Sequence, residues 1–174
     1  MKVLLFMLLA VLLMLSPMMW LRPSRGESLR GKLRHHVKRH GGELNFTKPP
    51  LALPDVPLVG YRLRYPGTAP GTDFTLVRDR VANEALSSAT DQWRWRQPPL
   101  PALDASRLEA LEAWLDSLPA DALVVESHEH TLCVWWQEGM ELARFQQDWA
   151  TWLAMRDTLA GSGRKKAVPV NPAG

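Results

Sequence analysis

The chain has 174 residues, 46% of them hydrophobic, and a formal net charge of +3. Basic residues concentrate after an N-terminal apolar run and at Arg164, Lys165 and Lys166, so that the remainder is acidic. This distribution argues against a nucleic-acid-binding domain, because such a domain spreads positive charge over its binding face. The length that follows the apolar run is typical of one folded domain.

An apolar run opens the chain from Val3 to Leu21, with a short Ser-Pro interruption near its end. As a helix it would be about 28 Å long, close to the thickness of a bilayer's hydrocarbon core. Trp20 falls where an interfacial aromatic anchor is expected. We therefore predict a transmembrane anchor over residues 1–22. A cleaved signal peptide starting at Lys2 is the alternative, but the run lacks the small residues at alternate positions that cleavage requires.

The residues after the run are strongly basic, and basic flanks stay on the cytoplasmic side of a span. The basic residues concerned are Arg22, Arg25, Arg30, Lys32, Arg34, Lys38 and Arg39. They predict a single-pass membrane protein with its N-terminus outside and its domain in the cytoplasm. The same residues are expected to face the anionic membrane surface. A single cysteine, Cys133, is typical of a reducing compartment.

Residues 23–42 are predicted to form a basic juxtamembrane helix that a Gly-Gly pair ends. A narrow apolar stripe recurs at every fourth residue: Leu29, Leu33 and Val37. Two interpretations remain open. The helix docks on the domain through this stripe, or it lies along anionic headgroups. Because stripe and charges occupy different faces, we favour docking with some attraction to the surface.

Alternation of apolar and polar residues indicates strands in the first half of the domain. The predicted strands are Leu44–Phe46, Val59–Tyr65, Phe74–Arg78 and Trp93–Arg96. The proline-rich stretch at residues 48–57 is expected to be an extended loop, because proline fits neither helix interiors nor central strands. Pro98, Pro99 and Pro101 are expected to end the strand that begins at Trp93.

The second half of the domain combines two helices with two strands. One helix is predicted from its N-cap Asp104 to Pro119, and strands follow at residues 122–126 and 131–137. The last helix ends at Gly161 and presents an apolar face made of Leu142, Phe145, Trp149, Trp152, Leu153 and Leu159.

Short turns between successive strands favour antiparallel pairing. We predict an α+β domain over residues 43–161, with an antiparallel sheet and helices on one of its faces. The tail at residues 162–174 is polar, basic and proline-containing, so we expect it to be disordered.

The sequence offers little support for a metal-binding site. His128 and His130 would share one face of a strand, but they flank an expected turn and lack a third ligand, so we interpret them as solvated. Histidines 35, 36 and 40 lie among positive charges, which lower their basicity and deter a cation. We expect Cys133 to be a buried structural thiol. No metal site and no cofactor are predicted.

Tryptophan and arginine alternate at Trp93, Arg94, Trp95 and Arg96, a pattern compatible with base stacking but more typical of a core face opposite a solvated face. Trp135 and Trp136 are adjacent, so they point to opposite sides of a strand. One of them must therefore leave the core face, where it is either covered by the last helix or exposed to solvent. Exposed aromatic and arginine side chains are typical of interfaces. We predict that these six residues form a protein-binding surface.

The sequence Trp20-Leu21-Arg22-Pro23, after a single span and before a basic helix, resembles the small accessory subunit of the bacterial preprotein translocase, the YajC type. In that family the span also ends in a Leu-Arg-Pro step followed by basic residues. The resemblance ends at Gly42, beyond which that family has a compact glycine-rich domain. It implies the same membrane topology and association with the translocase.

Phosphate-binding glycine loops, nucleophile elbows and zinc-peptidase motifs are absent from the sequence, so we do not expect an enzyme. The predicted function is that of an inner-membrane accessory or scaffold protein that binds a partner protein through its cytoplasmic domain. A membrane-tethered enzyme or small-ligand sensor with a tryptophan-lined pocket is the alternative.

Overall fold

The computed structural model of the chain describes residues 7, 25–49, 51 and 57–163. Except for Met7, the predicted anchor lies outside the described residues, as do Arg22 and residues 164–174. Among the helices of the described part, none is long and apolar enough to cross a membrane.

A seven-stranded sheet forms the centre of the domain, with the strand order β1-β2-β7-β6-β3-β5-β4. Every neighbouring pair is antiparallel. The strands are β1 (Gly42–Asn45), β2 (Val59–Arg64), β3 (Asp73–Arg78), β4 (Ser87–Thr90), β5 (Trp93–Leu100), β6 (Ala122–His128) and β7 (Thr131–Trp136). The predicted α+β class and antiparallel pairing are confirmed.

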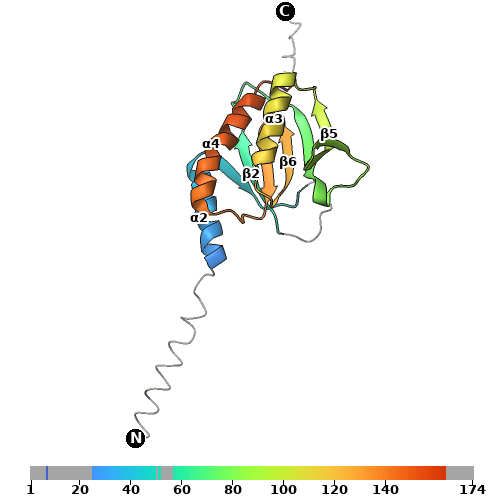
Figure 1. Cartoon of the computed structure of the whole chain (residues 1–174). Helices are drawn as coiled ribbons and strands as arrows, with labels where there is room; N and C mark the ends of the chain where they lie inside the picture. The colour runs from blue at the N-terminus through green and yellow to red at the C-terminus, as the bar shows by residue number, and fades with distance from the viewer. Residues whose placement is uncertain (1–6, 8–24, 50, 52–56, 164–174) are drawn as a thin grey trace, which may run out of the picture.

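Three helices pack on one face of this sheet, as Figure 1 shows. They are α2 (Arg25–Arg39), α3 (Ala105–Ser117) and α4 (Leu142–Leu159). The side chain of Asp104 caps α3 by accepting a hydrogen bond from the Arg107 backbone N–H, as predicted. A short 3-10 turn, η1 (Asp79–Val81), follows β3.

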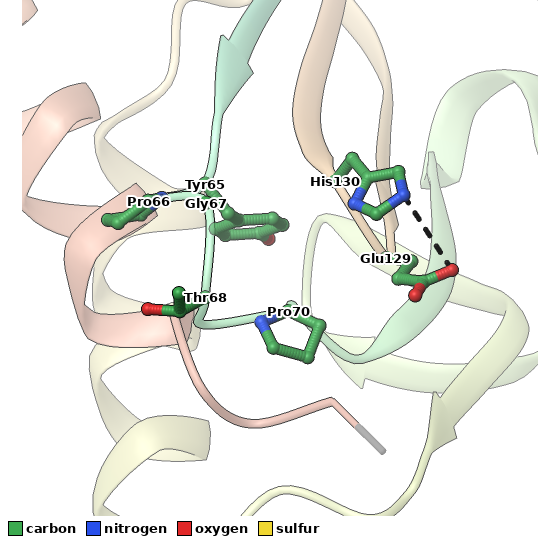
Figure 2. A pocket seen from close by; sticks show the side chains of 7 residues that line it. All are labelled: Tyr65, Pro66, Gly67, Thr68, Pro70, Glu129 and His130. Carbon is green, nitrogen blue, oxygen red and sulfur yellow. Dashed lines mark ion pairs between the residues drawn. The ribbon is translucent and has the colours of Figure 1, made fainter. Parts of the chain in front are cut away.

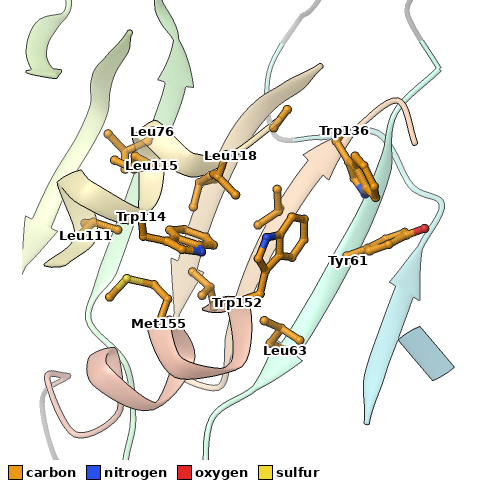
Figure 3. Close-up of a cluster of buried hydrophobic side chains, with 14 of the residues drawn as sticks. Tyr61, Leu63, Leu76, Leu111, Trp114, Leu115, Leu118, Trp136, Trp152 and Met155 are labelled. Carbon is orange, nitrogen blue, oxygen red and sulfur yellow. The ribbon is translucent and has the colours of Figure 1, made fainter. Parts of the chain in front are cut away.

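An aromatic core fills the space between the helices and the sheet (Figure 3). Trp136 stacks on Phe145 at 5.4 Å between ring centroids and meets Tyr61 edge-on at 5.2 Å. Trp152 crosses Trp114 edge-on at 6.2 Å. Offset and edge-on pairs at these distances stabilise a core beyond simple burial. The alternating residues of β2 and the apolar face of α4 therefore meet in one layer.

Parts of the sheet differ from the prediction. β4 was not predicted, because its Ser-Ser-Ala-Thr sequence is polar; it forms an edge strand with two exposed serines. Pro98 and Pro99 lie inside β5 rather than ending it. They fall between Gln97 and Leu100, where the pairing with β3 is irregular, so no regular ladder hydrogen bond is lost.

The two ends of the domain bring further corrections. Phe46 was expected to alternate inward with Leu44, but it follows β1 and its exposed fraction is 62%. The tail was predicted to be disordered from Ser162, yet its first two residues are hydrogen-bonded. The Ser162 hydroxyl oxygen accepts the Thr72 backbone N–H at 3.0 Å, and the Gly163 N–H donates to the Pro70 carbonyl at 2.9 Å.

Candidate functional site

The helix that carries the basic residues is docked on the domain. Leu33 and Val37 on α2 are fully buried, and Leu29 is partly buried against the same core. This confirms the docking interpretation of the apolar stripe. Gly41, which follows the helix, has a φ of +81°, a conformation that glycine adopts without strain.

The buried carboxylate of Glu138 connects α2 to the domain by hydrogen bonds. Glu138 accepts hydrogen bonds from Arg34 Nε at 2.8 Å and Arg34 Nη2 at 2.5 Å, and from the Tyr61 hydroxyl at 2.7 Å. Its side chain is 2% exposed, whereas that of Arg34 is 34% exposed. The hydrogen bond to Glu138 raises the pKa of Arg34, and burial raises the pKa of Tyr61. We call these three residues the Glu138 cluster.

The Glu138 cluster was not predicted. Arg34 and Glu138 are 104 positions apart in sequence, and nothing near Glu138 marks it as buried. Its φ of 61° places it in the left-handed region, which costs free energy for a residue other than glycine. That conformation directs the carboxylate toward α2.

A groove of about 520 Å³ lies between α2 and α4, and we call it the α2–α4 groove. Its lining residues are Ser28, Gly31, Lys32, His35, His36, Arg39, His40, Leu142 and Gln146. None of these described lining residues is acidic. The groove is therefore a concentration of positive charge on the exposed side of the docked helix.

His36 lines this groove and packs against aromatic residues of the core. Its ring stacks on His40 at 4.0 Å and meets Phe145 and Trp149 edge-on at 5.9 and 6.1 Å. Burial, followed by the charges of His40 and Arg39, lowers the pKa of His36. The predicted lowering of basicity is thus confirmed at this histidine, although burial is its first cause.

A second polar cluster lies on the face of the sheet opposite the helices. Glu126 is 5% exposed and accepts a hydrogen bond from Trp135 Nε1 at 3.0 Å. The His128 ring lies between two carboxylates, with Nε2 3.6 Å from Glu126 and Nδ1 3.7 Å from Asp73. We call these four residues the Glu126 cluster.

The charges in the Glu126 cluster stabilise one another. Glu126 and then Asp73 raise the pKa of His128 against the effect of burial. Burial alone would raise the pKa of Glu126, but His128 and Trp135 bring it below its ordinary value. The arrangement favours the protonated form of the His128 imidazole and the ionised form of the Glu126 carboxyl group.

Replacing His128 with glutamine is expected to destabilise the protein in a pH-dependent way. Because the folded pKa of His128 is raised, its contribution is complete below the ordinary value of 6.5 and is lost as pH rises through the folded pKa. Urea unfolding should therefore separate His128→Gln from the wild type at about pH 5.5 and bring them together at about pH 8.5. His130→Gln, at a side chain 81% exposed, is the control. An equal loss at both pH values would contradict the assignment.

The turn between β6 and β7 forms one side of a pocket of about 330 Å³, with the turn after β2 opposite (Figure 2). His130 Nε2 lies 3.8 Å from Glu129, and both side chains are at the surface. Tyr65 also lines the pocket, and its hydroxyl group forms a hydrogen bond of 2.7 Å with that of the buried Ser127. Within the described part of the chain, no group of three or more His, Cys, Asp or Glu side chains is placed to hold a metal ion.

Cys133 is buried on the sheet face that bears the Glu126 cluster, and its exposed fraction is 1%. Burial raises the pKa of its thiol, so the thiol is neutral at physiological pH. The predicted burial of this cysteine is confirmed.

The structure contradicts the tryptophan exposure on which the predicted tryptophan-arginine surface depends. Trp93, Trp135 and Trp136 are at most 1% exposed. Trp136 lies in the aromatic core, while Trp135 packs on the opposite face of the sheet with Leu58, Leu123, Val124 and Cys133. Both faces of β7 are therefore covered, and neither tryptophan is available to a partner.

The remaining members of that predicted surface are dispersed. Trp95 is partly buried against Phe74 at 5.8 Å, and Arg94 pairs with Asp79. Only Arg96 is exposed. The alternation along β5 was interpreted correctly as buried and solvated faces, but it does not form an aromatic interface.

The residues predicted to face the membrane occupy different environments in the structure. Arg30, Lys32, Lys38 and Arg39 are exposed on α2. Arg34 instead turns to Glu138, and its guanidinium also lies 5.1 Å from the centre of the Phe46 ring. Arg25 begins α2.

No family model, curated protein or solved structure matches this chain.

Proposed function

We propose that the protein is a single-span accessory or scaffold protein of the bacterial inner membrane, with its N-terminus outside and an α+β domain in the cytoplasm that binds a partner protein. The observation that carries the proposal is the docking of α2. This helix starts close behind the apolar run and is held to the domain by Leu33, Val37 and the Glu138 cluster. An anchor joined to such a helix would hold the domain in a defined orientation.

The exposed basic side chains of α2 support placement at a membrane surface. Each lysine or arginine near an anionic surface contributes about 1 kcal/mol of attraction. Arg30, Lys32, Lys38 and Arg39 remain available for this interaction because the apolar stripe, and not the charged faces, contacts the domain. Association with the translocase rests on the resemblance of the Trp20–Pro23 segment alone.

The alternative, a sensor or enzyme with a tryptophan-lined pocket, has less support. Trp136 packs against Tyr61, Phe145 and Trp152 of α4. Trp95 packs against Phe74, and Trp135 is buried on the opposite face of the sheet. Neither the α2–α4 groove nor the Figure 2 pocket has a tryptophan in its lining. A third pocket, between α3 and α4, is lined by Trp114 of α3 and by no sheet tryptophan. The aromatic residues therefore act as core.

A reporter active only in the cytoplasm, fused after Gly174, is expected to be active, because basic residues after a span stay on the cytoplasmic side. Activity of a reporter that works only in the periplasm would contradict the orientation. The mass of the purified protein should correspond to a chain starting at or near Met1. Loss of about twenty residues would instead establish a signal peptide.

The same cells allow the partner to be sought by affinity capture from detergent-solubilised membranes. A fusion that carries residues 1–22 without the domain is the control. A protein captured by the full chain and not by this control supports binding through the domain. Capture of the same protein by both would place the interaction on the anchor instead.

A further inference from the structure

The α2–α4 groove gathers donors and positive charge from one side of α2. Ser28, Lys32, His35, His36 and Arg39 follow one another at spacings that place them on one helical face. That face is distinct from the apolar stripe and from the side that carries Arg34. The opposite wall is the start of α4, including Gln146.

We propose that the α2–α4 groove is a binding site for a phosphate group, held by Lys32 and Arg39 with hydrogen bonds from Ser28, His36 and Gln146. The ligand is a phospholipid headgroup or a soluble phosphate compound. Binding of a phospholipid headgroup rests on the proposed function, because it requires the domain to lie at a membrane. Binding of a soluble phosphate compound does not depend on the proposed function.

Charge is the first argument for this ligand. Two permanent cations line the groove, and its described lining includes no carboxylate to neutralise them. Lysine and arginine hydrogen bonds to phosphate oxygens are among the stronger polar interactions in proteins. A metal ion would meet repulsion from the same two side chains, so the three lining histidines do not favour a cation site.

Unused hydrogen-bonding capacity is the second argument. His36 Nε2 is buried, and among the described residues it has no hydrogen-bond partner, although buried polar atoms are nearly always paired. The helix α4 begins at Leu142, which lines the groove, and the side chain of its N-cap residue Glu141 makes no capping hydrogen bond within the described structure. The free backbone N–H groups of such a helix start add positive potential.

Size is the third argument. A volume of about 520 Å³ exceeds that needed for a phosphate ion alone and lies within the range of small-ligand sites. The groove can therefore accept a phosphate that carries a glycerol or another small substituent. The groove is lined by α2, the first helix of the described domain, whose position Figure 1 shows.

The test uses the full chain in dodecyl maltoside micelles and isothermal titration calorimetry. One arm titrates inorganic phosphate, and the other titrates micelles doped with phosphatidylglycerol against micelles doped with phosphatidylcholine. The groove variant is Lys32→Gln with Arg39→Gln. Its matched control, Arg30→Gln with Lys38→Gln, removes the same charge from exposed positions of the same helix outside the groove lining.

We expect saturable binding in at least one arm, weakened about tenfold or more in the groove variant and less than about threefold in the control. Binding of phosphatidylglycerol alone identifies a headgroup as the ligand, and binding of inorganic phosphate identifies a soluble one. Equal weakening by both variants would show diffuse charge attraction and overturn the proposal. So would the lack of saturable binding in both arms, a result that leaves the reporter test of orientation unaffected.

Discussion

Replacing Leu33 with aspartate is expected to lower the free energy of unfolding by about 3 kcal/mol or more. Leu33 is fully buried where α2 meets the core. An aspartate there either leaves an unpaired charge in an apolar environment or separates the helix from the domain. Urea unfolding of the full chain, followed by tryptophan fluorescence, measures the loss.

The matched control is Gly31→Asp, which adds the same charge to the same helix. A side chain added at Gly31 meets no atom within 4 Å, so this variant should unfold at nearly the wild-type urea concentration. If Leu33→Asp and Gly31→Asp unfold together, α2 is not docked in solution. The proposed rigid link between anchor and domain would then fail.

Replacing Glu138 with alanine is expected to cost about 2–3 kcal/mol. The change removes the acceptor shared by Arg34 and the Tyr61 hydroxyl and leaves a partly buried guanidinium without its carboxylate. Arg34 is about one-third exposed, so water compensates part of the loss, and we place the cost below that of a fully buried pair.

Glu138→Gly separates the lost interaction from the backbone strain. Both variants lack the carboxylate, but glycine adopts the φ of 61° without strain, so Glu138→Gly should be more stable than Glu138→Ala by about 1 kcal/mol. Glu43→Gln, which breaks the exposed pair with Arg64, should leave the midpoint nearly unchanged. A wild-type midpoint in Glu138→Ala would show that the Glu138 cluster does not hold α2.

Local patterns predicted the elements that have one buried face. The four-residue spacing of Leu29, Leu33 and Val37 predicted both a helix and the side by which it docks. The alternation of Tyr61 and Leu63 with arginines predicted a half-buried strand in the same way. In these cases the spacing along the chain matches the geometry of the element, so no distant residue is needed to interpret it.

The burial of Trp135 could not be predicted in this way. Adjacent tryptophans in a strand point to opposite faces, and the sequence indicated which residues alternate but not how many faces are covered. Trp135 is buried because Leu58, Leu123 and Val124 converge on the helix-free face and because Glu126 accepts its indole N–H. These residues come from separate segments that only the folded sheet brings together.

The α2–α4 groove and the Glu138 cluster also depend on contacts between distant segments, which local sequence patterns do not predict. The sequence by itself determined the apolar run, the basic helix with its stripe, the antiparallel α+β class and the burial of Cys133, since composition and periodicity carry that information. Only the tertiary structure determines that Arg34 pairs with Glu138 instead of facing solvent with the other basic residues of α2. The same is true of the α2 histidines, which lie against α4. Long-range pairing depends on strand order and helix docking, which arise from the free energy of the whole core rather than from any local spacing.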